Sequence, residues 1–334
     1  MGRLIWSLRD ALQRIAPDIV HLHGARPLFI GALAAKLAKR RTIVSTLHGS
    51  YRVMALDHKG QERPALRLLA KLVHFVGFAL SNRILIDSQA LESEVGGVYR
   101  GLSLDYKAVK RKKVRLAYKS VDVDELDCSP KDHDLRADLG LAPDTVVFGT
   151  VSRLDEPKKG LGVLLRAFAP LARDLPNVHL IVCGGGWARE LLEHQVQDLG
   201  IAGQITLLGF YQNLADVYRA LDVFVLPSLS EGFPTVILEA MAFSLPVIST
   251  DVGGCREAVL NGRTGFLVAV GDVVQLRSAM ERLVKDPEMR QRYGTNARKY
   301  VQSRFTVLKM AEAVERTYRE LIPAPSPNAF GNRL

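Results

Sequence analysis

Two glutamates, Glu231 and Glu239, stand eight residues apart in the segment SLSEGFPTVILEAMA. An apolar run that predicts a buried strand ends at Pro227, and a helical pattern begins at Pro234, where a proline costs no hydrogen bond. The start of a helix offers backbone N–H groups and the positive end of a dipole, so it suits an anion such as phosphate. Carboxylates on either side can accept hydrogen bonds from sugar hydroxyls. A solvated loop glutamate and an ordinary helix glutamate would show the same spacing.

Three cations follow another predicted strand, in the segment GTVSRLDEPKKG. Arg153, Lys158 and Lys159 would therefore lie at the carboxyl edge of a sheet, where open α/β sheets bind ligands. Fixed cations at this edge can neutralise a diphosphate leaving group as its charge develops. Solvated loop cations remain the alternative for these residues taken alone.

Glycine-rich turns end two more predicted strands. The segment LIVCGGG contains Gly184 and Gly185, and DVGGCREA places Glu257 after a second pair of glycines. Each could be no more than a tight turn. The four segments support one another because all of them are expected at the same edge of one sheet.

Alternating strands and helices surround these segments, which predicts an α/β fold with doubly wound parallel sheets. A linker is expected at about 120–140, and residues 287–321 are expected to be helical throughout. In the first half, strands are expected at 18–23, 42–47 and 83–86, with helices at 3–15, 28–39 and 64–80. In the second half, strands are expected at 146–151, 178–183, 205–209, 223–227, 246–250 and 266–268.

Together these motifs resemble the C-terminal domain of retaining GT-B glycosyltransferases, in particular glycosyltransferase family 4 (glycosyl transferases group 1). The resemblance is carried by the E-x7-E pair at 231 and 239, by Arg153 with Lys159-Gly160, by GGG at 184–186, and by the segment from Gly253 to Val268 that contains GRTGFLV. It implies two Rossmann-like domains facing a cleft, at 1–125 and 126–305. A returning helix is implied at 306–322, followed by a tail at 323–334. Family members have further strands before the one at 18–23, so the resemblance also implies a first domain without its initial strands.

The resemblance also implies roles for individual residues. Arg153 and Lys159 would bind the diphosphate of the donor, Glu231 would contact the transferred sugar and Glu239 the ribose. A nucleoside-diphosphate sugar is the implied donor, a UDP-sugar in preference to a GDP-sugar, with no metal and no other cofactor. The further donor-binding residues would be Gly232, Phe233, Pro234, Thr235, Val236, Gly184 and Gly185.

Two predicted strand ends in the first half carry histidines, in DIVHLHG and TLHG. The resemblance implies that His48, followed by Gly49, would act near the donor sugar and the acceptor, and that His23 and Ser88 could line the same cleft. Structural histidines and a loop serine are the alternatives.

The charge is divided unequally along the chain. Residues 1–120 hold 22 Lys and Arg against 8 Asp and Glu, a balance of +14, whereas the rest of the chain balances at −4. Arg63, Arg67, Lys71 and His74 fall at helical spacing, so the segment 63–83 could be a basic helix on an anionic membrane or a helix packed on the sheet. Nucleic acid is not expected, because no recognised module accompanies the charge.

The sequence therefore predicts a retaining hexosyltransferase that acts on a glycan or lipid-linked acceptor in the synthesis of surface polysaccharide, lipopolysaccharide or glycolipid. Three widely separated cysteines fit a cytoplasmic protein, which could lie on the inner face of the membrane. A non-catalytic nucleotide-sugar-binding relative and a GT-B nucleotide-sugar epimerase remain alternatives.

The sequence departs from the family pattern at two places. The family's Asn-Gly near the linker is replaced by Lys119-Ser120, and its Gly-Gly-x-Pro-Glu loop reads GGCRE.

Overall fold

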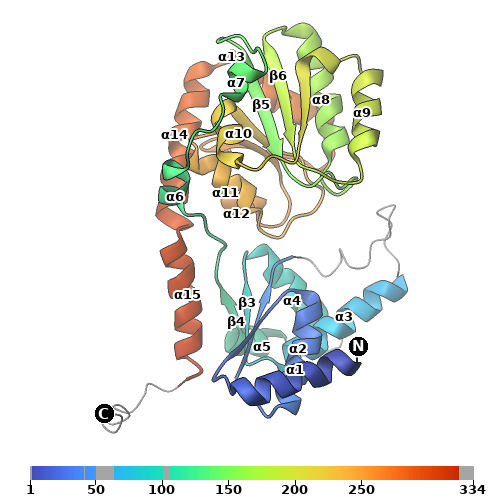
Figure 1. Cartoon of the computed structure of the whole chain (residues 1–334), viewed down its shortest axis with the longest axis vertical. Helices are drawn as coiled ribbons and strands as arrows, with labels where there is room; N and C mark the ends of the chain where they lie inside the picture. Colours follow the sequence, from blue (N-terminus) through green and yellow to red (C-terminus); the bar gives the residue numbers. More distant parts are fainter. Residues whose placement is uncertain (1, 41, 50–63, 101–105, 323–334) are drawn as a thin grey trace. The chain divides into compact units, whose positions relative to one another are not determined.

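The computed structural model describes residues 2–40, 42–49, 64–100 and 106–322. The chain divides into two compact units, one formed by Met1–Tyr118 with Leu308–Leu334 and the other by Lys119–Val307. Each unit contains one parallel β-sheet with helices packed on it (Figure 1). The predicted α/β class with two parallel-sheet domains is confirmed.

The first unit has a four-stranded sheet in the order β1-β2-β3-β4. Its strands are short, and the side chains of β2 are all buried, as expected for a parallel strand that is covered on both faces. Its elements are α1 (Gly2–Ile15), β1 (Val20–His23), α2 (Ala25–Leu37), β2 (Ile43–Leu47), α3 (Pro64–Leu80), β3 (Arg83–Ile86), α4 (Ala90–Arg100), α5 (Tyr106–Lys113), β4 (Val114–Leu116) and α15 (Val307–Arg319).

The helix α15 closes the core of the first unit from the far end of the sequence. Its Ala313 and Val314 pack against Val44 and Leu85 of the sheet. Just after the helix, the carboxylate of Glu320 accepts hydrogen bonds from the guanidinium groups of Arg83, at 2.8 Å, and Arg115, at 2.8–3.2 Å. The first unit is therefore built from two separate stretches of chain.

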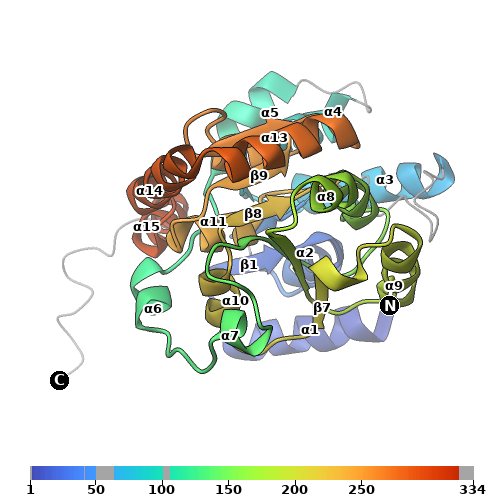
Figure 2. The same ribbon diagram turned by 90° about the horizontal axis from the view of Figure 1, so that it is seen from above.

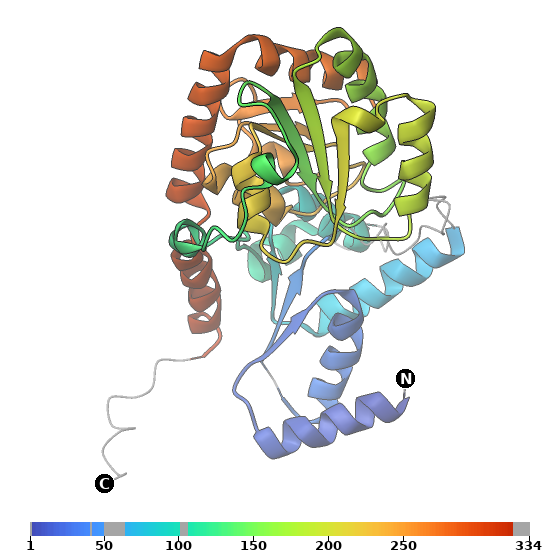
Figure 3. The same ribbon diagram turned by 45° about the horizontal axis from the view of Figure 1, so that its top comes forward.

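The second unit has a six-stranded parallel sheet in the order β10-β9-β8-β5-β6-β7. The strand order reverses between β5 and β8, which are direct neighbours, and Figure 3 shows β5, β6 and β7 as the green to yellow arrows. The elements are α6 (Val123–Cys128), α7 (Leu135–Asp138), β5 (Val146–Val151), α8 (Leu161–Asp174), β6 (Val178–Cys183), α9 (Arg189–Asp198), a 3₁₀ turn η2 (Ala202–Gln204), β7 (Ile205–Gly209), α10 (Leu214–Ala220), β8 (Val223–Leu226), α11 (Thr235–Ala242), β9 (Val247–Thr250), α12 (Cys255–Ala258), β10 (Gly265–Val268), α13 (Val273–Lys285) and α14 (Pro287–Arg304).

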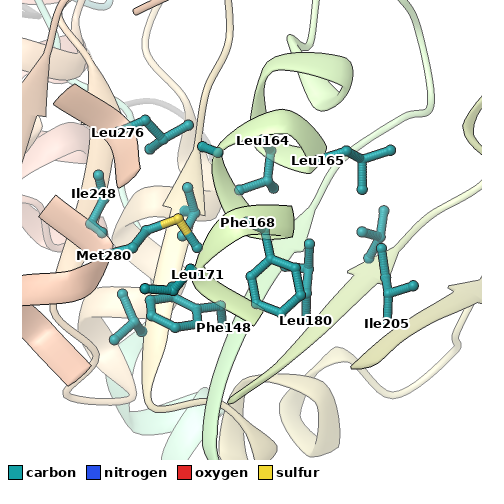
Figure 4. Close-up of a cluster of buried hydrophobic side chains, with 14 of the residues drawn as sticks. Phe148, Leu164, Leu165, Phe168, Leu171, Leu180, Ile205, Ile248, Leu276 and Met280 are labelled. Carbon is teal, nitrogen blue, oxygen red and sulfur yellow. The ribbon is translucent and has the colours of Figure 1, made fainter. Parts of the chain in front are cut away.

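The main core of the second unit lies on the face of the sheet covered by α8 and α13, which run side by side (Figure 2). Phe168 of α8 packs over Phe148 of β5, and Met280 of α13 reaches the same cluster (Figure 4). Because both faces of this sheet are covered, β5 and β6 are buried along their whole length. This rigid frame holds the loops at the ends of the strands.

The chain's connections differ from the sequence prediction in two details. The segment expected to be a linker at about 120–140 contains two short helices, α6 and α7, because Asp122 and Asp134 act as helix N-caps by accepting hydrogen bonds from the N–H groups of Glu125 and Ala137. The helix expected over 287–321 is interrupted at 305–306. There the carbonyl of Phe305 accepts a hydrogen bond from the N–H of Val121, at 3.0 Å.

The predicted basic stripe on α3 does not extend to His74. His74 is buried, and its Nδ1 lies 2.7 Å from the carbonyl of Ala70. Arg63 and the side chain of Arg67 lie outside the described residues. The exposed side chains of α3 include four leucines, which are Leu66, Leu68, Leu69 and Leu72.

Candidate functional site

The loops that follow β5 and β8 are joined at the point where the strand order of the second sheet reverses. The N–H of Leu229 donates to the carbonyl of Lys158, at 2.8 Å. Gly160 has a φ of +64°, and a Cβ at this residue would lie 2.1 Å from the carbonyl oxygen of Pro227. Only glycine fits here, so the two loops approach closely and place Lys159 beside the loop after β8.

Lys159 and Glu231 form the centre of this site. The Lys159 Nζ lies 2.7 Å from Glu231 Oε1, and the two side chains are only 15% and 11% exposed. Ser228 Oγ donates to the same carboxylate oxygen at 2.7 Å. Because both contacts use Oε1, the second oxygen, Oε2, can accept from a sugar hydroxyl. The Lys159 ammonium group is held in position by its contact with Glu231, and from there it can bind an anion.

The helix α11 begins immediately after this pair. Pro234 is its N-cap and not its first helical residue, and no side chain caps the first turn. The N–H groups of Thr235 and Val236 therefore have no helical acceptor and can bind a phosphate. At the start of the neighbouring helix α8, the first N–H group is already hydrogen-bonded, because the Glu156 carboxylate accepts from the N–H of Leu161.

Glu239 lies on α11 and is oriented by Tyr218 of α10. The Tyr218 hydroxyl donates to Glu239 Oε2 at 2.7 Å. Burial raises the pKa of Tyr218 well above its ordinary value, and Glu239 raises it further, so the phenol keeps its proton and remains a donor. The other carboxylate oxygen of Glu239 can then accept from a pair of ribose hydroxyls.

Two other basic residues of the loop after β5, Arg153 and Lys158, do not pair with Glu231 in the way that Lys159 does. Arg153 is 76% exposed, and its guanidinium lies 3.7 Å from Asp155, so the structure does not bring it into contact with Glu231. Burial lowers the pKa of Lys158, while Glu231 acts in the opposite direction. Lys159 is thus the predicted cation that the structure pairs directly with the predicted carboxylate.

The predicted glycines and Phe233 have structural contacts of their own. A Cβ at Gly184 would lie 1.8 Å from the carbonyl oxygen of Ser152, whereas a Cβ at Gly185 would meet open space. The ring of Phe233 is buried, with its centroid 5.3 Å from that of Phe305. Its carbonyl accepts from Lys119 Nζ at 3.1 Å. Gly232 accepts from the N–H of Gly254 at 2.6 Å, which fixes the backbone ahead of α11.

The predicted residues of the first unit gather at the ends of β1, β2 and β3. His23 Nδ1 lies 3.1 Å from His48 Nε2, and His48 Nδ1 lies 3.3 Å from an oxygen of Asp87. Gly49 follows His48 in a bend. Ser88 is fully buried, so the structure does not bring its hydroxyl to the surface with the histidines.

Sequence reasoning missed four side chains that orient the predicted ones, namely Ser228, Tyr218, Lys119 and Asp87. Ser228 stood inside the segment already singled out, and Lys119 stood where the sequence departs from the family pattern. Among the described residues, no group of three or more His, Cys, Asp or Glu side chains is arranged to hold a metal ion.

Comparisons with known proteins identify two family models in this chain. The model described as glycosyl transferases group 1 matches residues 131–300, and glycosyltransferase family 4 matches residues 1–125. The crystal structure of Anabaena Alr3699/HepE in complex with UDP superposes with a TM-score of 0.79 over 95% of this chain and 82% of that one, at 22% identity. The shared architecture is the GT-B fold.

Two curated relatives illustrate the range of matches. An Escherichia coli enzyme named UDP-Gal:alpha-D-GlcNAc-diphosphoundecaprenol alpha-1,3-galactosyltransferase is 27% identical over 95% of this chain and 79% of its own length. A D-inositol 3-phosphate glycosyltransferase of Rhodococcus erythropolis is 38% identical, but that match covers 57% of this chain and 45% of the relative.

Proposed function

The chain belongs to the glycosyl transferases group 1 family and is a glycosyltransferase, and from this premise we propose that it transfers a hexose, with retention of the anomeric configuration, to a hydroxyl group of a glycan or lipid-linked acceptor. The observation that carries the proposal is the Lys159–Glu231 pair beside the uncapped start of α11. It offers a cation, two backbone donors and a carboxylate within one pair of adjoining loops.

The donor in this proposal is a nucleoside-diphosphate sugar. Its diphosphate binds Lys159 and the N–H groups of Thr235 and Val236, its ribose binds Glu239, and its sugar binds Glu231. The E. coli relative is named for UDP-galactose, and the Anabaena structure contains UDP, which supports a UDP-sugar in preference to a GDP-sugar. In this proposal Arg153, whose side chain is 76% exposed, also binds the diphosphate.

The chemical step breaks the bond between the anomeric carbon and the diphosphate oxygen. The electron pair leaves with the nucleoside diphosphate, whose charge Lys159 stabilises. The acceptor oxygen attacks from the same face, and its proton passes to the departing phosphate oxygen. No strong protein base is required in this scheme.

The donor assignment is tested by thermal-shift titration of the wild-type protein with UDP, GDP and their sugars. We expect UDP and UDP-hexoses to raise Tm, and Glu239→Ala to weaken UDP binding by roughly 10–100-fold, since a hydrogen bond to a charged group contributes about 1.5–3 kcal/mol. Tyr218→Phe should weaken it less, because only the orientation of Glu239 is lost.

Arg189→Ala is the matched control, since Arg189 pairs with Glu193 on the surface of the same unit. A stronger response to GDP would contradict the preference for UDP. UDP binding without turnover would favour the non-catalytic alternative, and a changed sugar nucleotide formed without acceptor would favour the epimerase.

We also propose that the first unit contacts an anionic membrane on its cytoplasmic side, in the synthesis of surface polysaccharide, lipopolysaccharide or glycolipid. Leu68 and Leu69 of α3 are 59% and 56% exposed in a unit with a strongly basic sequence. Apolar side chains beside basic ones suit the boundary between headgroups and acyl chains. None of the described helices is both long enough and apolar enough to span a bilayer.

Flotation with phosphatidylglycerol vesicles tests this contact. We expect wild-type protein to float at low salt and to be released as salt is raised, and Leu68→Ser with Leu69→Ser to reduce flotation about 10-fold or more. Leu308→Ser is the control, because Leu308 is 74% exposed on α15. Wild-type protein that stays in the bottom fraction at low salt would contradict the proposal.

A further inference from the structure

Four side chains form a continuous row at the carboxyl end of the first unit's sheet. They are His21 and His23 of β1, His48 after β2 and Asp87 after β3. The ring centroids of His21 and His23 are 4.1 Å apart, and those of His23 and His48 are 5.4 Å apart and stacked. Asp87 is 1% exposed, whereas His48 is 40% exposed, so the row runs from a buried carboxylate toward the surface.

The hydrogen bonds in this row determine where the protons lie. A carboxylate only accepts hydrogen bonds, so His48 Nδ1, at 3.3 Å from Asp87, must carry a proton. In neutral His48 the other nitrogen, Nε2, is then without a proton and accepts. Its partner at 3.1 Å is His23 Nδ1, which must therefore be the donor. This leaves His23 Nε2 as a ring nitrogen with a lone pair.

His21, which lies on the other side of His23, does not change these proton positions. His21 uses both ring nitrogens, with Tyr318 Oη and Thr46 Oγ1 each at 2.6 Å. Burial, followed by repulsion from His23 and His48, lowers the pKa of His21 to about 4, so His21 is neutral near pH 7. Burial, followed by repulsion from His48, also lowers the pKa of His23. The lowered pKa favours the neutral form of His23, and its neighbour His21 is held in place by its two hydrogen bonds.

We propose that Asp87 is a positioning residue: it fixes the tautomer of His48 and, through His48, that of His23, so that Nε2 of His23 is presented as a hydrogen-bond acceptor for a sugar hydroxyl. The proposal rests on the proposed function, which supplies the sugar. To that function it adds Asp87, a residue that does not touch the sugar. Without the Asp87 carboxylate, the hydrogen bond between His23 and His48 would run in the opposite direction, from His48 to His23. Free histidine favours the opposite tautomer, with the proton on Nε2, so the row imposes a specific state.

Long-range ¹H–¹⁵N spectra of histidine-labelled wild-type protein at about pH 8 test the tautomers directly. The chain has eight histidines, and His23→Gln and His48→Gln assign the two relevant signals. We expect both His23 and His48 to carry the proton on Nδ1. A proton on Nε2 of either ring would overturn the proposal, and this measurement needs no variant at Asp87.

Asp87→Ala, which removes both carboxylate acceptors, supplies the second measurement. We expect the two signals to shift toward the Nε2-protonated form and kcat to fall on the order of 10–100-fold, as for other groups that orient a histidine, with UDP affinity unchanged. Asp18→Ala, at an exposed aspartate of the same unit, should change neither. Unchanged tautomers in Asp87→Ala would overturn the proposal. Absence of turnover in the wild type would instead contradict the proposed function, because the tautomers do not depend on it.

Discussion

Replacing Lys159 with alanine is expected to lower kcat/KM for the nucleotide sugar by about 10²–10³-fold. The ammonium group stabilises negative charge that develops on the leaving diphosphate, and a preorganised cation in a partly buried site requires no reorganisation during the reaction. The loss has a second cause. Without Lys159, the carboxylate of Glu231 would face the anionic donor uncompensated.

The measurement is release of UDP from the nucleotide sugar that gives the strongest thermal shift. Lys285→Ala is a matched control, because Lys285 also pairs with a glutamate, Glu281, but on the exposed face of α13. Rates within threefold of wild type in Lys159→Ala would remove the residue from the chemical step.

The double variant Lys159→Met with Glu231→Gln is expected to regain stability but not activity. Each single variant leaves one partner of a mostly buried ion pair without its counter-charge, which should cost roughly 1–3 kcal/mol and lower Tm by several degrees. The double variant removes both charges, keeps similar volumes, and leaves an amide oxygen that can accept from the Ser228 hydroxyl in place of the carboxylate. Its Tm should therefore return close to that of the wild type.

Activity in the double variant should stay at least 10²-fold below wild type, because neither the cation nor the carboxylate is restored. Thermal melts and UDP-release rates on the same preparations separate the two roles. Recovery of activity together with Tm would show that the pair serves the fold alone.

The sequence predicted the sheets and the site most reliably where a local pattern determines the structure. Apolar runs such as 146–151 and 178–183 form strands because both faces of the sheet are covered, and the structure has them at β5 and β6. Glu231 and Lys159 were assigned separately to the ends of two strands, and the reversal of strand order between β5 and β8 brings them together.

Partners from distant parts of the chain could not be predicted in this way. Asp87 and His48 are 39 positions apart, and nothing in the local pattern of either residue indicates the other. The break between α14 and α15 also coincides with a distant partner, because the N–H of Val121 donates to the carbonyl of Phe305 in a sequence that is otherwise helical. Asp122 and Asp134 looked like loop formers because N-caps and loops favour the same residues.

The place of α15 in the first unit sets an order for folding during synthesis. The second unit is one continuous stretch, Lys119–Val307, so it can fold as soon as that stretch has left the ribosome. In the first unit, Val44, Leu85 and Ala117 pack against side chains of α15 and the residues just after it, which are synthesised later than the second unit. We therefore expect this part of the first unit's core to form only after the whole of Lys119–Val307 has been synthesised.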